Sequence, residues 1–375
     1  MRERESPARA VTVAGFAVFV LLGVVIASYG PSIPHITHRF HLSVSVAGLI
    51  VTANFMGEII GLLSMGLTHA RWRLGSRLAF GTTLFGVGLL AAAAAPTWPL
   101  LLLGVFALGI GAGGLVVLIN LYFATRFGRR SPAMLSLVNT AYGTGNFIGP
   151  AVVALTGGYS IVFGVVGVGV LACVLFLARA EDEVVAGALA PPMLTRRTLA
   201  LVLAFAALLL VYEGLEAGVG TWEATDLLSF GSSTQFAAAA TSLFWGAFTV
   251  GRVLTAPLAV RWSPQRLLVP AFVISAVLLV GIRIQLAPPL LFALVGLCAA
   301  PIFPVAISWM TRVIPNATTL STYAILGAVI GSALVPAGLG ALIGLAGASA
   351  LPLGVAACAL ASLGMVGVIT LRLRN

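Results

Sequence analysis

Apolar residues dominate the chain in long runs that short polar segments separate. Segmentation at charges, Pro and Gly gives runs near residues 11–30, 44–68, 76–95, 99–124, 132–156, 159–178, 198–222, 234–259, 267–286, 289–311, 318–345 and 350–371. Each run has the ~20 residues with which an α-helix crosses a bilayer. A membrane β-barrel would instead show short segments of alternating hydrophobicity. The pattern therefore predicts an all-α membrane protein with twelve transmembrane helices.

One longer polar segment, "RAEDEVVAGALAPPMLTRR", divides the runs into two sets of six. We expect an N-terminal six-helix bundle at 1–178, a cytoplasmic linker at 179–197 and a C-terminal six-helix bundle at 198–375. The two halves also echo each other, since "LSLVNTAYGTGNFIGP" in the fifth run lies opposite "LSTYAILGAVIGSALVP" in the eleventh. Two such repeats are typical of secondary transporters, whose substrate site lies near the midplane between the halves.

Composition supports a membrane protein. The chain has 375 residues, of which 60% are hydrophobic and 8% charged, and its mean hydropathy is +1.12. All 20 basic residues are arginines, and they cluster between the apolar runs rather than on a basic face with aromatics, so we expect no binding of nucleic acid. Only Arg39 and Arg283 lie in segments on the outer side. This bias predicts a multi-pass protein of the cell (inner) membrane with both termini in the cytoplasm.

We expect no cofactor, no metal site and no enzymatic activity. The three cysteines lie in separate apolar runs and suit buried positions. His35, His38 and His41 follow the first run with a spacing that permits a metal site or an external pH sensor, but no fourth ligand lies nearby, and a solvated loop is favoured. A membrane-embedded enzyme would need clustered His and Asp, or a nucleophile and base, within the runs.

The six-plus-six arrangement with short Arg-bearing loops resembles the major facilitator superfamily over the whole chain. The loop after the second run, "GLTHAR", keeps Gly66 and Arg71 of the family signature but has Ala70 where the family has Asp. The resemblance implies transport by alternating access. It also implies a gating or structural role for Arg71.

A narrower resemblance is to the fucose–proton symporter type. The pattern Tyr-x-Gly-x-Glu of its seventh helix matches Tyr212, Gly214 and Glu216, and "YGTGNFIGP", "FWGAFTVGR" and "APIFP" resemble its fifth, eighth and tenth helices. The resemblance implies proton symport of a sugar and gating or structural roles for Pro150 and Arg252. Symporters of this type carry carboxylates in the first and fourth helices. This chain has none there, so other acids would carry protons.

Three acids fall within the predicted bilayer core. Counting from 198 at a helical rise, Glu213 lies roughly 22 Å and Glu216 roughly 27 Å up the seventh run. Glu58 lies roughly 21 Å from the outer end of the second run. Ionisable residues at such depth are functional candidates, so these three are the predicted proton carriers, with a structural pairing as the alternative for each. Glu223 and Asp226 fall at or beyond the outer border, and we expect them to face water and to be dispensable.

Polar and aromatic side chains within the runs suit a sugar. Asparagines hydrogen-bond hydroxyls, aromatic rings stack on a pyranose, and the alternative for each asparagine is a helix–helix hydrogen bond. The predicted substrate-binding residues are Asn54, Asn120, Asn139, Tyr142, Asn146, Tyr212, Trp222, Trp245 and Trp309. The sequence thus favours a monomeric importer that moves a small polar solute, a hexose or related sugar, with protons. Proton-coupled efflux of drugs or metabolites is the alternative, since "GNFIGP" partly resembles an antiporter signature.

Overall fold

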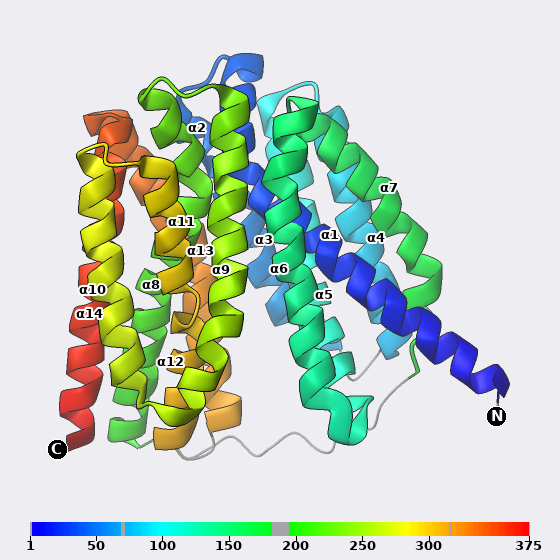
Figure 1. Ribbon diagram of the computed structural model, residues 1–375. Helices are drawn as coiled ribbons and strands as arrows, with labels where there is room; N and C mark the ends of the chain where they lie inside the picture. The colour runs from blue at the N-terminus through cyan, green and yellow to red at the C-terminus, as the bar shows by residue number, and fades with distance from the viewer. Residues whose placement is uncertain (1, 69–71, 182–194, 315–316, 375) are drawn as a thin grey trace. The chain divides into compact units, whose positions relative to one another are not determined.

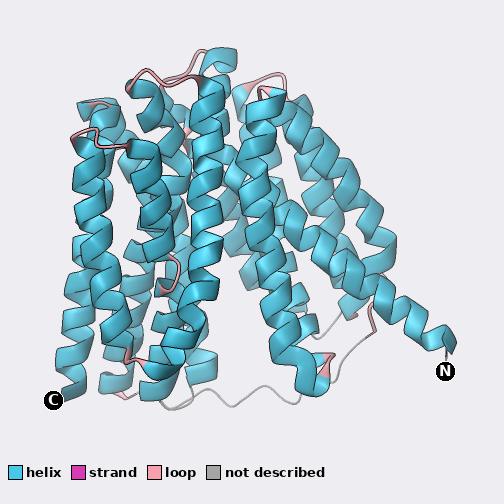
Figure 2. Cartoon of the chain, in the orientation of Figure 1, coloured by secondary structure: helices cyan, strands magenta, loops and turns pink. Residues whose placement is uncertain are grey.

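The computed structural model describes residues 2–68, 72–181, 195–314 and 317–374, which form helices and connecting turns without a strand among them (Figures 1 and 2). The first helices are α1 Arg2–Phe40, α2 Val44–Ala47, α3 Leu49–Thr68, α4 Leu74–Ala94, α5 Trp98–Thr125, η1 Gly128–Arg130, α6 Ser131–Thr156 and α7 Tyr159–Leu177. The later ones are α8 Arg196–Ser229, α9 Thr234–Arg261, α10 Pro264–Arg283, α11 Pro288–Ala299, α12 Ile302–Val313, α13 Ala317–Ala346, η2 Ala348–Ala350 and α14 Leu351–Arg374.

Within the described residues, 11 helical stretches are long and apolar enough to cross a membrane. α6, with 26 residues, has the length for a further span but is less apolar. Asn139, Thr140, Thr144 and Asn146 account for its polarity. The prediction of an all-α membrane fold is confirmed, and α6 supplies the remaining helix of the expected twelve.

The chain forms two compact units. The first contains Met1–Leu42 and Leu49–Ala186, and the second contains Ser43–Gly48 and Gly187–Asn375. The short helix α2 thus belongs to the second unit, in which Gly48 packs against the indole of Trp222. Most of the expected linker, 182–194, lies outside the described residues. The predicted division at 179–197 stays a prediction.

Within the first unit, α3 and α5 pack backbone against backbone through glycines on both helices. These glycines are Gly57 and Gly61 in α3 and Gly109 and Gly113 in α5. A Cβ on Gly109 would meet the carbonyl oxygen of Asn54, and one on Gly113 would meet that of Glu58. Pairs of small residues four apart allow such close approach of membrane helices. The packing therefore fixes the height of Asn54 and Glu58 against α5.

Glycines also allow close backbone packing of α1 against α6 and of α8 against α13, and each pair lies within one unit. Gly145 and Gly149 of α6 lie against backbone carbonyls of α1, and Gly327 and Gly331 of α13 lie against backbone carbonyls of α8. These glycines belong to the two segments of the fifth and eleventh runs that echo each other in the sequence. Their shared packing role is what two structural repeats would show, and it supports the two-repeat interpretation.

Two runs depart from the expected helices. The tenth run, expected as one helix over 289–311, breaks at Ala300 and Pro301 into α11 and α12, because Pro301 has no backbone N–H to continue the helix. α1 spans 39 residues, well beyond the expected 11–30. Its extension contains His35 and His38, so the expectation that these two residues lie in a loop is wrong.

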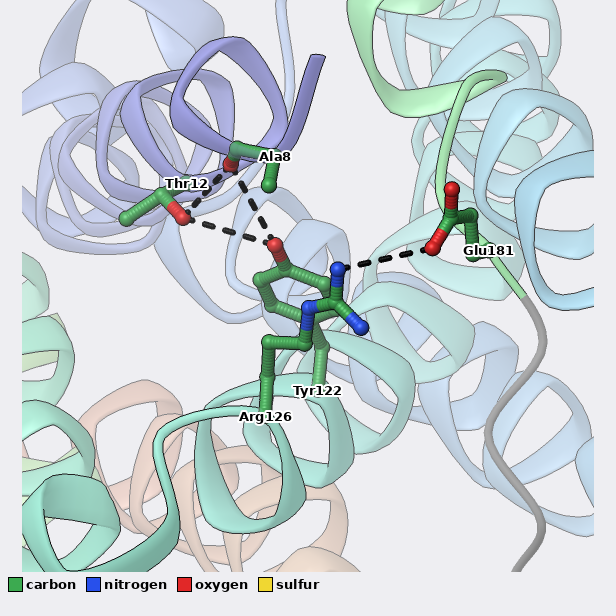
Figure 3. Close-up of polar contacts among 5 residues, drawn as sticks. All are labelled: Ala8, Thr12, Tyr122, Arg126 and Glu181. Atoms are coloured by element: carbon green, nitrogen blue, oxygen red, sulfur yellow. Dashed lines mark hydrogen bonds and ion pairs between the residues drawn. The ribbon is translucent and has the colours of Figure 1, made fainter. Parts of the chain in front are cut away.

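The first turns of α1 are tied to the end of α5 (Figure 3). Thr12 donates a hydrogen bond of 2.9 Å to the carbonyl of Ala8, and the Tyr122 hydroxyl donates to the same carbonyl at 3.4 Å. One turn further, Arg126 pairs with Glu181 at 3.4 Å. That ion pair is exposed, and such pairs contribute little stability. Substitution of Glu181 should therefore change stability little, which makes it a suitable control carboxylate.

Candidate functional site

In the first unit, a chain of hydrogen bonds leads from α1 to Glu58. The Tyr29 hydroxyl donates to Oδ1 of Asn54 at 3.0 Å, and the Asn54 amide donates to Oε1 of Glu58 at 2.8 Å. Tyr29 and Asn54 are buried, whereas Glu58 is half-buried. The structure thus joins two predicted residues and adds Tyr29, which sequence reasoning missed. The sequence marked Tyr29 only as a single tyrosine near the end of the first apolar run.

A second group of polar side chains connects α5 and α6. The Asn139 amide donates to Oδ1 of Asn120 at 2.9 Å, and the Asn120 amide donates to the carbonyl of Val116 at 2.7 Å. Asn139 is exposed, as are Ser136 and Thr140 on the same helix. Lipid cannot satisfy an exposed amide at membrane depth. This face of α6 therefore suits a wet surface, and Asn120 and Asn139 suit a polar solute.

The other two predicted residues of α6 pack against α1. The Tyr142 ring is half-buried and meets Phe19 edge-on, with centroids 6.4 Å apart. Asn146 is buried, and a Cβ on Gly23 would lie 3.0 Å from its Oδ1. Asn146 is therefore placed for helix packing as much as for a solute. Pro150 is buried within the same helix, whereas Arg71 lies outside the described residues.

In the second unit, Tyr212 connects Glu216 to the break in the tenth run. Its hydroxyl lies 2.6 Å from Oε2 of Glu216 and 3.1 Å from the carbonyl oxygen of Ala299, the last residue of α11. Tyr212 is fully buried and Glu216 is half-buried. A cavity of about 230 Å³ borders the break at Pro301 and Pro304. The arrangement ties an acid to a discontinuous helix that has room beside it.

Two further charged residues surround this contact. Arg252 acts electrostatically on Glu216, and its guanidinium stacks on Phe248 with 4.5 Å to the ring centroid. Glu213 accepts a hydrogen bond of 3.2 Å from Ser332 of α13. Two of the predicted proton carriers, Glu213 and Glu216, thus face different partners although they are three residues apart.

The three predicted stacking tryptophans are all packed against protein. Trp222 is 0% exposed and donates its indole N–H to the carbonyl of Pro336 at 2.8 Å. Trp309 meets Phe205 edge-on at 5.3 Å, and Trp245 packs on Gly220. A sugar would reach these rings only after a rearrangement. Trp222 in this structure holds α8 to α13.

The expectation that Glu223 and Asp226 face water is wrong, because both side chains are 0% exposed. α8 continues to Ser229, beyond the expected end at 222, and every residue from Gly218 to Leu227 is buried. A depth count along one helix ignores the neighbours that surround it. In the described part of the chain, no group of three or more His, Cys, Asp or Glu side chains is placed to hold a metal ion.

A sequence model of the Major Facilitator Superfamily matches residues 15–336. The chain belongs to the Major Facilitator Superfamily. Members of this superfamily are membrane transporters, so the broad prediction of a transporter is confirmed. No curated protein matches the sequence.

Solved structures of other Major Facilitator Superfamily transporters share the fold. A D-xylose–proton symporter has a TM-score of 0.77 at 16% identity, with 95% of this chain and 96% of that chain covered. The nucleoside transporter NupG has a TM-score of 0.77 at 15% identity, with 98% and 99% covered. A bacterial homologue of the human lysosomal transporter Spinster has a TM-score of 0.69 at 14% identity, with 99% and 96% covered. At these identities the likeness shows the fold.

Proposed function

We propose that the protein imports a small neutral polar solute, a sugar or a compound that contains one, together with protons by alternating access. The observation that carries the proposal is the contact of Tyr212 with both Glu216 and Ala299. A tyrosine hydroxyl has a single hydrogen to donate. Two acceptors therefore compete for it whenever Glu216 is ionised.

Protonation of Glu216 resolves this competition. A protonated Glu216 donates to the Tyr212 oxygen, and Tyr212 then donates to the carbonyl of Ala299, so every group has a partner. An ionised Glu216 draws the Tyr212 hydrogen to itself and leaves that carbonyl unsatisfied, which costs about 1–3 kcal/mol when it is buried. Such a difference shifts a two-state equilibrium roughly fivefold to a hundredfold. A proton on Glu216 thus favours the present arrangement of α11 and α12.

The substrate class is supported by side chains and by relatives. The exposed amide of Asn139 and its partner Asn120 offer donors and acceptors but no charge, which suits hydroxyl groups. D-xylose and nucleosides, named for two transporters of the same fold, both contain a sugar ring. The arginine bias supports cytoplasmic termini in a cell inner membrane. We propose a monomer, with lipid, solute and protons as its partners.

The test uses purified protein in liposomes that enclose a pH-sensitive dye, under an imposed pH gradient. D-xylose, uridine and tetraphenylphosphonium are added outside in separate runs, with protein-free liposomes as the control. The proposal predicts that a sugar or a nucleoside accelerates acidification of the interior. If only the lipophilic cation moves protons, and in the direction opposite to its own flux, efflux replaces the proposal.

A further inference from the structure

Glu223 and Asp226 are buried acids that take no part in the proposed coupling through Glu216 and Tyr212. They are three residues apart on α8, and both are 0% exposed. Among the residues that the structure describes, none of their four carboxylate oxygens has a hydrogen-bond partner. A buried ionised carboxylate is costly unless it is paired or hydrogen-bonded. An orphaned buried group in a native protein requires an explanation.

α9 carries two further buried polar groups that lack a partner among the described residues, one on Trp245 and one on Ser242. A Cβ on Gly220 would lie 2.6 Å from Cζ2 and 3.3 Å from Cε2 of Trp245, so the six-membered ring of the indole packs against α8 at Gly220. Nε1 of Trp245 is buried and has no partner in the described part of the chain. Ser242 lies one turn from Trp245 on α9, and its buried Oγ also has no partner among the residues that the structure describes.

Around Glu223 and Asp226, the negative charges outnumber the positive charges that act on them. Glu223 and Asp226 repel each other, and Arg283 at the end of α10 attracts Asp226. Among the described residues, none of the titratable side chains on the helices that pack against α8 acts on Glu223. In the described residues these are Arg252 and Arg261 of α9, Cys298 of α11, Arg312 of α12, Tyr323 of α13, and Cys358, Arg372 and Arg374 of α14. Arg283 thus acts on Asp226, and no cation among the described residues acts on Glu223, so an ionised Glu223 would be a negative charge without compensation.

We infer that Glu223 and Asp226 form a proton-binding site, in which Glu223 holds the proton and Arg283 compensates an ionised Asp226. A proton needs no cavity, unlike a metal ion, and it removes the charge that lacks a partner. Glu216 lies seven residues before Glu223, on the same face of α8, with the Trp245 indole between them at Gly220. A part for this site in transport rests on the proposed proton coupling, whereas its occupancy does not.

The test measures proton occupancy without any substrate. Infrared spectra of the full-length protein in detergent at neutral pH, recorded in H2O and D2O, resolve the C=O band of protonated carboxyl groups. We expect Glu223→Gln to remove a component of this band and Glu181→Gln to leave the band unchanged. An unchanged band in Glu223→Gln overturns the inference. Loss of that component when Na⁺ replaces K⁺ also overturns it, because sodium would then be the occupant.

A second variant keeps both carboxyl groups in place. Arg283 is exposed, so Arg283→Gln should fold, and removal of the compensating cation should add a second protonated carboxyl to the band. If the C=O band of protonated carboxyl groups does not grow in Arg283→Gln, the assignment of an ionised Asp226 compensated by Arg283 is wrong. The inference and the proposed function also fail separately. A Glu223 component without solute-driven proton flux refutes only the transport proposal, and flux without that component refutes only the site.

Discussion

Tyr212 binds Glu216 one turn further along α8, at 2.6 Å, and the same hydroxyl lies 3.1 Å from the carbonyl of Ala299. Because of this contact, protonation of Glu216 on α8 determines whether Tyr212 donates its hydrogen to the carbonyl of Ala299 at the end of α11. Pro301 creates that break by removing a backbone donor. Glu216, Tyr212 and the α11–α12 break therefore act as one unit in the proposed coupling.

Removal of the Tyr212 hydroxyl should weaken this unit. Tyr212→Phe keeps the ring and leaves the Ala299 carbonyl without its partner, so we expect a loss of about 1–3 kcal/mol in the free energy of unfolding. Thermal unfolding in detergent gives the comparison. Tyr323→Phe is the matched control, since Tyr323 in α13 is exposed. Equal stability of the two variants would show that the Tyr212 contact contributes nothing.

Glu58 offers a test that separates hydrogen bonding from charge. Asn54 donates to Oε1 of Glu58, and Gln at this position keeps an oxygen acceptor whereas Leu does not. We expect Glu58→Gln to retain the stability of the unmutated protein and Glu58→Leu to lose about 1–3 kcal/mol. Urea-dependent or thermal unfolding of the two variants measures the difference. A stable Glu58→Leu variant would rule out a structural need for the contact.

The glycine packing of α3 against α5 gives a steric prediction. A Cβ on Gly113 would meet the carbonyl oxygen of Glu58, so Gly113→Ala should cost about 1–3 kcal/mol by overpacking. Gly364 in α14 has nothing within 4 Å of a built Cβ, and Gly364→Ala should be neutral or gain up to about 1 kcal/mol from helix propensity. If both alanines behave alike, the two helices are not in backbone contact.

The long apolar runs predicted the all-α membrane fold because run length is set by bilayer thickness. The break at Pro301 was missed because proline is tolerated in membrane helices when neighbours satisfy the freed carbonyl. Here Tyr212, distant in sequence, donates a hydrogen bond to the carbonyl of Ala299, beside the break. Sequence spacing cannot reveal such a contact.

The acids of α8 show even more clearly that contacts between distant segments cannot be predicted from spacing along one helix. Their order along the helix predicted Glu216 within the bilayer core and Glu223 in outside water, yet Glu223 is 0% exposed. Burial depends on what other helices place around a residue, and the sequence of α8 carries no record of α9 and α13. The motif that contains Tyr212 and Glu216 was still sufficient to select the pair that the structure joins.

Membrane orientation is open to direct labelling. In a variant without Cys173, Cys298 and Cys358, single cysteines introduced at 126–131 or 261–266 should react only with reagent on the cytoplasmic side. A cysteine in place of Thr97 should react only from outside, because the arginine bias puts that connection on the other face. The opposite labelling pattern would invert the proposed topology and with it the direction of import.

Proton-driven accumulation by Glu216→Gln is the most direct test of coupling. The Gln amide can donate to Tyr212, so the variant mimics a permanently protonated Glu216 and keeps the Ala299 contact. In liposomes with an imposed pH gradient, we predict that Glu216→Gln exchanges labelled solute across the membrane but no longer concentrates it, while Glu181→Gln concentrates it normally. Uphill accumulation by Glu216→Gln at the rate of the unmutated protein would contradict coupling through Glu216.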